Sequence, residues 1–201
     1  MVPRFPLAGL ALLGLAALVV LAGCAPGGAG PMNGPELLLQ AKAHNLRFKA
    51  AVAVVQTHLY SGAWSSGGDY GAVPGDWLDC GEGEYQFALS RMGPIGVVPP
   101  IEPAVLADRL RIDGWREISI REFPGISDDV VVTAQKPSAA VIRLIVTFYE
   151  HPQGVSVAAD STCAPGDAWE ILQLMEGASG ELPAYPQTEA PGDVPLFESG
   201  G

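Results

Sequence analysis

The sequence predicts a single α+β domain: an antiparallel sheet of four to five strands, helices packed mainly on one face, an N-terminal helix and one disulfide. Three observations favour this class. Apolar residues recur at three- and four-residue spacing over 35–59, which is typical of an amphipathic helix. From Glu84 onward, apolar and polar residues alternate with a period of two, which is typical of half-buried strands. Short Pro- and Gly-containing turns separate the later strands, and such turns join antiparallel neighbours.

The composition limits the class of protein. The 201 residues include 11 Lys and Arg against 22 Asp and Glu, and the formal net charge is −11. An acidic chain lacks the phosphate-neutralising surface that nucleic acids require, so we expect no nucleic-acid partner. The length and the three cysteines also argue against a multidomain machine, a polytopic membrane protein and a disulfide-dense toxin.

The N-terminal segment resembles a bacterial lipoprotein signal. An uncharged run of apolar residues and glycines leads up to Leu21; it is short for a membrane span but suits a secretory signal. The run ends in Leu21-Ala22-Gly23-Cys24, which resembles the lipobox of bacterial lipoproteins. That resemblance implies a lipoprotein signal peptide over 1–23, recognition of Leu21, Ala22 and Gly23 by a signal peptidase, and lipidation of Cys24. The alternatives are a secreted protein cleaved elsewhere and an uncleaved anchor.

Lipidation of Cys24 would leave two of the three cysteines, Cys80 and Cys163, in an oxidising compartment. We expect them to form a disulfide, which would close a loop of about 84 residues and stabilise the fold by roughly 4.6 kcal/mol through chain entropy. The alternative is a pair of buried free thiols. Cys80 precedes the first strand and Cys163 follows the last, so antiparallel pairing of these strands would bring both cysteines to one edge of the sheet.

The domain is expected over 35–176, after a flexible Gly- and Pro-rich tether over 24–34. Its first helix carries an apolar stripe of Leu38, Ala41, Phe48, Val52, Val55 and Leu59. We expect the stripe to pack on the sheet, although such a stripe could also support dimerisation. The basic residues Lys42, Arg47 and Lys49 are interpreted as a solvated face, with contact to anionic headgroups as the alternative.

The remaining elements follow in chain order. Strands are expected at 84–90, 115–123, 130–134, 140–149 and 155–160. Two short helices are expected, one opening at Glu102 and Pro103 and one covering 167–175. The residues expected to face the core from the strands include Ile118, Ile120, Ile142, Leu144, Val146 and Phe148. We favour pairing of the first strand with the last.

The C-terminal segment 177–201 is predicted to be a disordered acidic tail. It contains four Pro, five Gly and four acidic residues, and no Lys or Arg occurs after Arg143. Such a segment has too little apolar surface to offset the entropy of ordering it.

Chemical motifs are scarce. The sequence contains no recognisable hydrolase, zinc or thioredoxin-like motif, so we expect no catalytic residues, no metal site and no cofactor. His44 and His58 are about 21 Å apart along one helix, too far to share a metal ion. Acidic residues around a Gly-rich loop are interpreted as solvated rather than as a calcium site: Asp69, Asp76, Asp79, Glu82 and Glu84. The aromatic residues of that loop, Trp64, Tyr70 and Trp77, are expected to fold onto the domain rather than to form a sugar or peptide groove.

The whole layout resembles the small uncharacterised lipoproteins of high-GC Gram-positive bacteria. The resemblance rests on the lipobox, the Gly- and Pro-rich tether, Cys80 with Cys163, the junction Asp113-Gly114-Trp115, and the strand end Asp160-Ser161-Thr162-Cys163. It implies a lipid-anchored protein on the outer face of the cell membrane, and it supplies no catalytic residues.

We therefore expect a non-enzymatic binding or interaction module of the cell envelope, with an envelope protein as a candidate partner. The alternative is a carrier of a small or lipidic ligand between sheet and helix. A third hypothesis is an enzyme with an unrecognised site. An apolar cavity between sheet and helix would favour the carrier, and a filled core beside an exposed patch would favour the interaction module. A cleft of polar residues with perturbed pKa values would favour the enzyme.

Overall fold

The computed structural model describes residues 33–67, 71, 73–75, 80–124, 127–177, 180–182 and 187–193, which belong to one compact unit over 31–201. The expected signal peptide, the residues Leu21 to Cys24 and most of the tether lie outside the described residues. In the described part of the chain, no helix is both long enough and apolar enough to cross a membrane.

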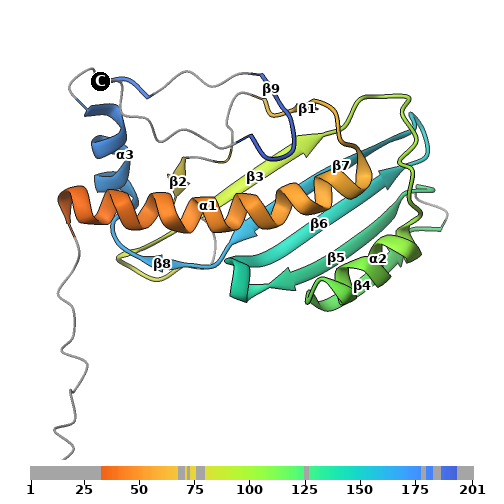
Figure 1. The fold of residues 1–201 in the computed structure, drawn as a ribbon, viewed down its shortest axis with the longest axis horizontal. Helices are drawn as coiled ribbons and strands as arrows, with labels where there is room; N and C mark the ends of the chain where they lie inside the picture. Colours follow the sequence, from red (N-terminus) through yellow and green to blue (C-terminus); the bar gives the residue numbers. More distant parts are fainter. Residues whose placement is uncertain are drawn as a thin grey trace, which may run out of the picture. The chain divides into compact units, whose positions relative to one another are not determined.

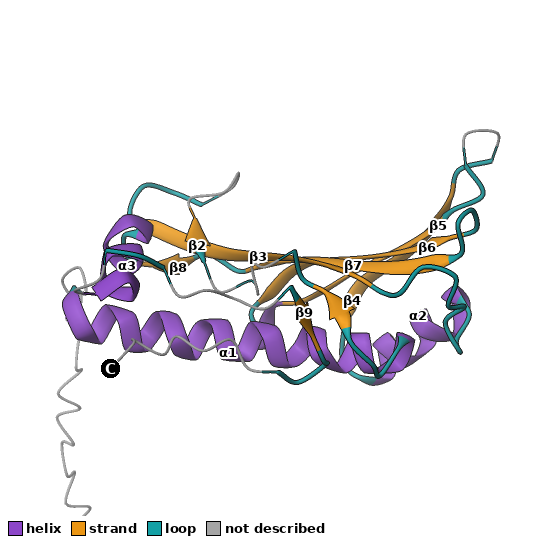
Figure 2. Ribbon diagram, turned by 90° about the horizontal axis from the view of Figure 1, so that it is seen from above, coloured by secondary structure: helices purple, strands orange, loops and turns teal. Residues whose placement is uncertain are grey.

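Helix α1 (Gly34–Leu59) confirms the long N-terminal helix and packs along one face of the sheet (Figures 1 and 2). Pro35 lies in its first turn, where a missing backbone N–H costs nothing. Phe48, Val52, Val55 and Leu59 of the expected stripe are fully buried. The stripe therefore faces the sheet of its own domain.

The sheet is antiparallel and larger than predicted. The described residues form nine strands, in the order β4-β5-β6-β7-β3-β1-β9, with β2 and β8 pairing beside β3. The five long strands match the sequence prediction: β3 (Glu84–Met92), β4 (Arg116–Glu122), β5 (Val130–Lys136), β6 (Val141–Tyr149) and β7 (Gly154–Ser161). The expectation of four to five strands missed four two-residue strands: β1 (Trp64–Ser65), β2 (Pro74–Gly75), β8 (Ala164–Pro165) and β9 (Thr188–Glu189). Two residues are too short for a periodic pattern to register.

The favoured pairing of the first long strand with the last is confirmed. β3 and β7 are antiparallel neighbours, and Leu89 lies opposite Ala159. Helix α2 (Pro103–Ile112) lies on the same face of the sheet as α1, beside β4 and β5 (Figure 2). Helix α3 (Ala168–Glu176) packs against α1 near Gly34, where Oε1 of Glu170 accepts a hydrogen bond from the backbone N–H of Gly34.

Two of the residues expected to face the core do not. A register shift between Val141 and Arg143 buries Val141 fully and leaves Ile142 40% exposed, so the alternation starts one residue out of phase. On β4, Ile118 packs against the core but Ile120 is 41% exposed. β4 is the last strand of its side of the sheet, so its residues have a neighbouring strand on one side only.

The tail prediction is wrong for residues 187–193. Thr188 and Glu189 form β9, which pairs with Ser65 and Trp64 of β1, and Glu189 is only 3% exposed. Its carboxylate accepts hydrogen bonds from Arg91 and from Lys49, whose Nζ lies 3.0 Å from Oε2. The interpretation of Lys49 as part of a solvated or headgroup-contacting face is therefore also wrong, because a carboxylate distant in sequence compensates its burial.

Candidate functional site

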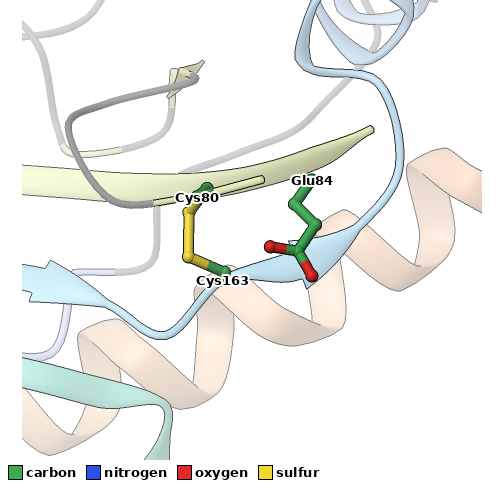
Figure 3. A group of neighbouring side chains, drawn as sticks. All are labelled: Cys80, Glu84 and Cys163. Atoms are coloured by element: carbon green, nitrogen blue, oxygen red, sulfur yellow. A yellow bond between two sulfur atoms is a disulfide. The ribbon is translucent and has the colours of Figure 1, made fainter. Parts of the chain in front are cut away.

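Cys80 and Cys163 form the predicted disulfide, with Cα atoms 5.6 Å apart (Figure 3). Pairing of β3 with β7 and β8 brings the two cysteines to one edge of the sheet, as the sequence predicts. Glu84 lies beside them and accepts a hydrogen bond from the backbone N–H of Gly81 at 3.0 Å. Both sulfur atoms are bonded to each other in the disulfide and are not available as thiolate ligands. Cys80, Glu84 and Cys163 therefore do not form a set of metal ligands.

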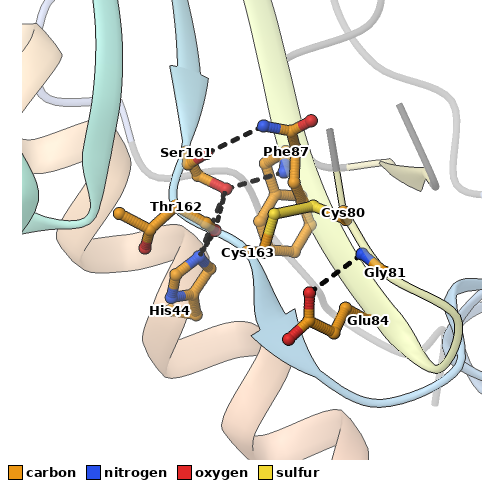
Figure 4. The surroundings of a disulfide bond; sticks show 9 residues. His44, Cys80, Gly81, Glu84, Phe87, Ser161, Thr162 and Cys163 are labelled. Carbon is orange, nitrogen blue, oxygen red and sulfur yellow. Dashed lines mark hydrogen bonds between the residues drawn. A yellow bond between two sulfur atoms is a disulfide. The ribbon is translucent and has the colours of Figure 1, made fainter. Parts of the chain in front are cut away.

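Close to the disulfide, His44 of α1 contacts the end of β7 (Figure 4). Its Nε2 lies 2.9 Å from the carbonyl oxygen of Thr162 and 3.2 Å from Oγ of Ser161. Because a carbonyl oxygen only accepts, we assign the proton to Nε2. Burial lowers the pKa of His44 from its usual 6.5, the Thr162 carbonyl opposes this shift, and the charge of Arg47 adds to it. His44 is therefore a neutral donor at neutral pH.

A serine beside a histidine is also the arrangement of a nucleophile and its base. Here the hydroxyl of Ser161 is already used: it accepts from the N–H of Phe87 at 2.8 Å and donates to the Thr162 carbonyl at 3.0 Å. Ser161 is fully buried, so a substrate has no approach to it. His44, with Nε2 protonated, offers this hydroxyl no base. The cluster joins α1, β3 and β7, which is a structural role.

Four buried polar atoms have no hydrogen-bond partner among the described residues: Gln40 Oε1, Asn45 Oδ1, Gln56 Nε2 and Tyr85 Oη. Burial raises the pKa of Tyr85 to about 12, because the phenolate cannot be solvated there. Asn45 and Gln56 lie on the same side of α1 as Lys49, at spacings of four and seven residues. These polar residues form one flank of the buried face of α1 and adjoin the apolar stripe that packs on the sheet.

Described residues line three of the grooves on the surface. One of about 420 Å³ lies on the sheet, where Arg143 pairs with Asp160. A second, of about 660 Å³, lies beside the disulfide and is bordered by Trp169, which is 66% exposed. The third, of about 260 Å³, lies at the other end of the sheet and combines apolar walls with an exposed apolar loop. We regard the third as the candidate functional site because it alone adjoins several exposed apolar side chains in one segment.

The apolar loop comprises residues 93–101, which follow β3 and contain no charged residue. Ile95 is 74% exposed and Val98 61% exposed, so the loop presents apolar side chains to solvent. The loop is nevertheless held in place, because the N–H of Gly93 donates to Val155 and the N–H of Gly96 donates to Gln153. Gly96 has a φ of 84°, a conformation that glycine adopts without strain.

The groove beside the apolar loop has mixed chemistry. Its walls include Val98, Ile101, Val130 and Phe148, and its acidic residues are Glu102, Asp128 and Glu150. Asp128, Glu150 and His151 place ligand atoms near one another, but all three are exposed, and an exposed acidic cluster alone is not a metal site. The groove therefore suits a partner segment whose apolar side chain contacts the apolar walls and whose positive charge lies next to the acidic residues.

The apolar loop lies at the end of α1 opposite Gly34. Gly93 lies against Trp64, and Nε1 of Trp64 donates to the carbonyl oxygen of Tyr60, the residue after α1. Gly34, by contrast, contacts α3. The 26 residues of α1 span about 39 Å, so the loop and the start of the domain are far apart.

Sequence reasoning did not find this surface. The sequence pattern predicts a strand over 84–90 and a helix that opens at Glu102, and it assigns no role to the residues between them, although a run of nine residues without charge is visible there. The acidic and aromatic residues considered in the sequence were those of the Gly-rich loop. Of these, five lie outside the described residues: Asp69, Tyr70, Asp76, Trp77 and Asp79. Trp64 is fully buried, as expected of an aromatic residue folded onto its own domain.

No protein-family model matches the sequence, and no curated protein matches it. Among solved structures, the chain is similar to a DUF4853 family protein from Actinomyces odontolyticus, with 13% identity, 77% of this chain and 79% of that chain covered, and a TM-score of 0.41.

Proposed function

We propose that this protein is a lipid-anchored module on the outer face of the cell membrane that binds a protein of the cell envelope through the apolar loop and its adjoining groove. The proposal is supported above all by the exposed apolar residues of the loop on a well-held backbone. Exposed apolar patches on folded domains mark interaction sites. The anchor rests on the lipobox at Leu21 to Cys24.

The charge around the groove favours a protein over a lipid surface as the occupant. Glu102, Asp128 and Glu150 would be repelled by anionic headgroups. The loop also lies about one length of α1 away from Gly34, the end that the tether would join to the membrane. The fitting partner carries an apolar side chain flanked by Lys or Arg.

The geometry gives less support to a carrier that holds a ligand between sheet and helix. Phe48, Val52 and Val55 of α1 are fully buried in one core cluster with residues of the sheet. A ligand in that position would have to displace core side chains.

The test is native mass spectrometry of the full-length protein, gently extracted from its own membranes. We expect the wild type to carry a second protein, and the variant Ile95→Asp to lose it while remaining folded. The control is Ile112→Asp on α2, since Ile112 is 84% exposed but lies outside the loop. A bound molecule of a few hundred daltons in place of a protein, or equal loss of the partner in both variants, would overturn the proposal.

A further inference from the structure

The C-terminal residues 187–193 include β9, which lies next to β1 at the end of the sheet order (Figure 1). Their contact with α1 is made by Glu189, which binds Lys49. They hold this position through few backbone contacts: β9 has two residues, and the N–H of Ser66 donates to the carbonyl of Gln187 at 2.9 Å. Pro191 lies two residues after the end of β9, and proline cannot donate to a ladder, so the strand is limited in length there. Backbone pairing over so short a ladder contributes little to holding the segment, so its position depends chiefly on the side chain of Glu189.

The side chain of Glu189 is held much more strongly than this backbone. Arg91 donates to both carboxylate oxygens through Nε and a terminal nitrogen, and Lys49 donates to Oε2 at 3.0 Å. All three side chains are at least nine-tenths buried. A planar arginine fork with a lysine beside it is the arrangement that proteins use to recognise a carboxylate.

Unused polar atoms lie on the same side of α1. Asn45 and Gln56 are one turn before and two turns after Lys49, and their buried Oδ1 and Nε2 atoms have no hydrogen-bond partner among the described residues. Buried polar atoms are normally paired, so these two atoms leave hydrogen-bonding capacity unused along α1 on either side of Lys49. The chain's own segment uses the charges of the site without satisfying these atoms.

We propose that Lys49 and Arg91 form a carboxylate-recognition site for an extended acidic peptide, which the chain's own residues 187–193 occupy until such a peptide replaces them. The occupant would add a strand to β1, as β9 does, and place a Glu or Asp side chain between the two cations. Trp64 and Ser65 of β1 supply the backbone edge. The cations of this site, Lys49 and Arg91, are not part of the apolar loop, although β1 adjoins Gly93 at the start of that loop. The proposal therefore does not depend on the function proposed above.

The test uses the full chain with Glu189→Gln, which keeps the shape of the side chain and removes its charge. The probe is a fluorescent, end-capped peptide of residues 187–193, and the matched control is the same peptide with Gln in place of the glutamate that corresponds to Glu189. By fluorescence anisotropy, we expect the glutamate peptide to bind E189Q at least tenfold more tightly than the wild type. We expect the glutamine peptide to bind E189Q at least tenfold more weakly than the glutamate peptide.

Equal binding of the two peptides to E189Q, or equal binding of the glutamate peptide to E189Q and wild type, would overturn the proposal. If E189Q does not fold, the wild type with a protease site in place of residues 183–186 is cut and kept as a two-piece protein. The labelled glutamate peptide is first bound to this two-piece protein. Unlabelled glutamate peptide should then displace it, and glutamine peptide should not. Displacement by both peptides contradicts the proposal. Dimerisation of the wild type that E189Q lacks would assign the site to exchange of segments between two copies, which also overturns it.

Discussion

Nζ of Lys49, in the middle of α1, lies 3.0 Å from Oε2 of Glu189, which is 140 positions further along the chain. Arg91 binds the same carboxylate from β3. One buried carboxylate thus joins the first helix, the sheet and the C-terminal segment, and the stability of the fold should depend on it.

We expect Glu189→Gln to lower the free energy of unfolding by about 3–5 kcal/mol, because it leaves two buried cations without their carboxylate. The measurement is urea denaturation followed by circular dichroism. Glu150→Gln, at an exposed position, is the control and should change stability by less than about 0.5 kcal/mol. Similar losses in the two variants would contradict the assignment of the buried cluster.

The disulfide should stabilise the fold chiefly by restricting the unfolded chain. Cys80 and Cys163 are 83 positions apart, and a loop of that length corresponds to about 4.6 kcal/mol in the chain-entropy treatment. We expect reduction of the wild type and the double variant C80A/C163A to lose similar amounts of stability in urea. The reductant should not affect the double variant, and an effect there would mean that the bridge is not its target.

Tyr85→Phe should leave stability unchanged or raise it by about 1 kcal/mol, because the buried hydroxyl of Tyr85 has no partner among the described residues. Tyr149→Phe is the matched variant: the Tyr149 hydroxyl lies 3.0 Å from Oγ of Ser156, and its loss should cost about 0.5–1.5 kcal/mol. Urea denaturation measures both. A clear loss for Tyr85→Phe would show that the hydroxyl has a partner.

The fold should become less stable as the pH falls below about 6.5. The pKa of His44 is lowered by burial in the folded state, so the unfolded chain takes up this proton first, near the ordinary value of 6.5. The contribution of His44 is therefore complete above 6.5 and is lost as the pH falls through its folded pKa. Melting temperatures at pH 7.5, 6.5 and 5.5 should fall more steeply for the wild type than for His44→Gln, and parallel curves would exclude His44 as the cause.

Membrane attachment should depend on Cys24. If the lipobox is used, Cys24→Ala cannot accept the diacylglyceryl group and should move from the membrane fraction to the soluble one. Cell fractionation with immunoblotting measures this, and Cys80→Ala serves as a cysteine variant outside the lipobox. A Cys24→Ala protein that stays with the membrane would refute the lipobox.

The long elements could be predicted from sequence because each carries many repeats of one period. The α1 stripe through Phe48 and Val55 and the alternation of β3 are local patterns, and burial of an apolar face enforces them. The errors come where one residue changes the register. At Val141 a single shift moved Ile142 out of the core, and nothing in the local composition marks that bulge.

The amino-acid pattern was sufficient for the α+β class, the long helices and strands along the chain, and the disulfide between Cys80 and Cys163, because hydrophobic periodicity and cysteine parity act along the chain. It was not sufficient for the carboxylate site or the apolar loop. Lys49 and Glu189 each resemble ordinary solvated charges in sequence, and only folding brings them together and removes water from them. Likewise, the residues of the loop 93–101 resemble any apolar segment until the fold leaves Ile95 and Val98 uncovered.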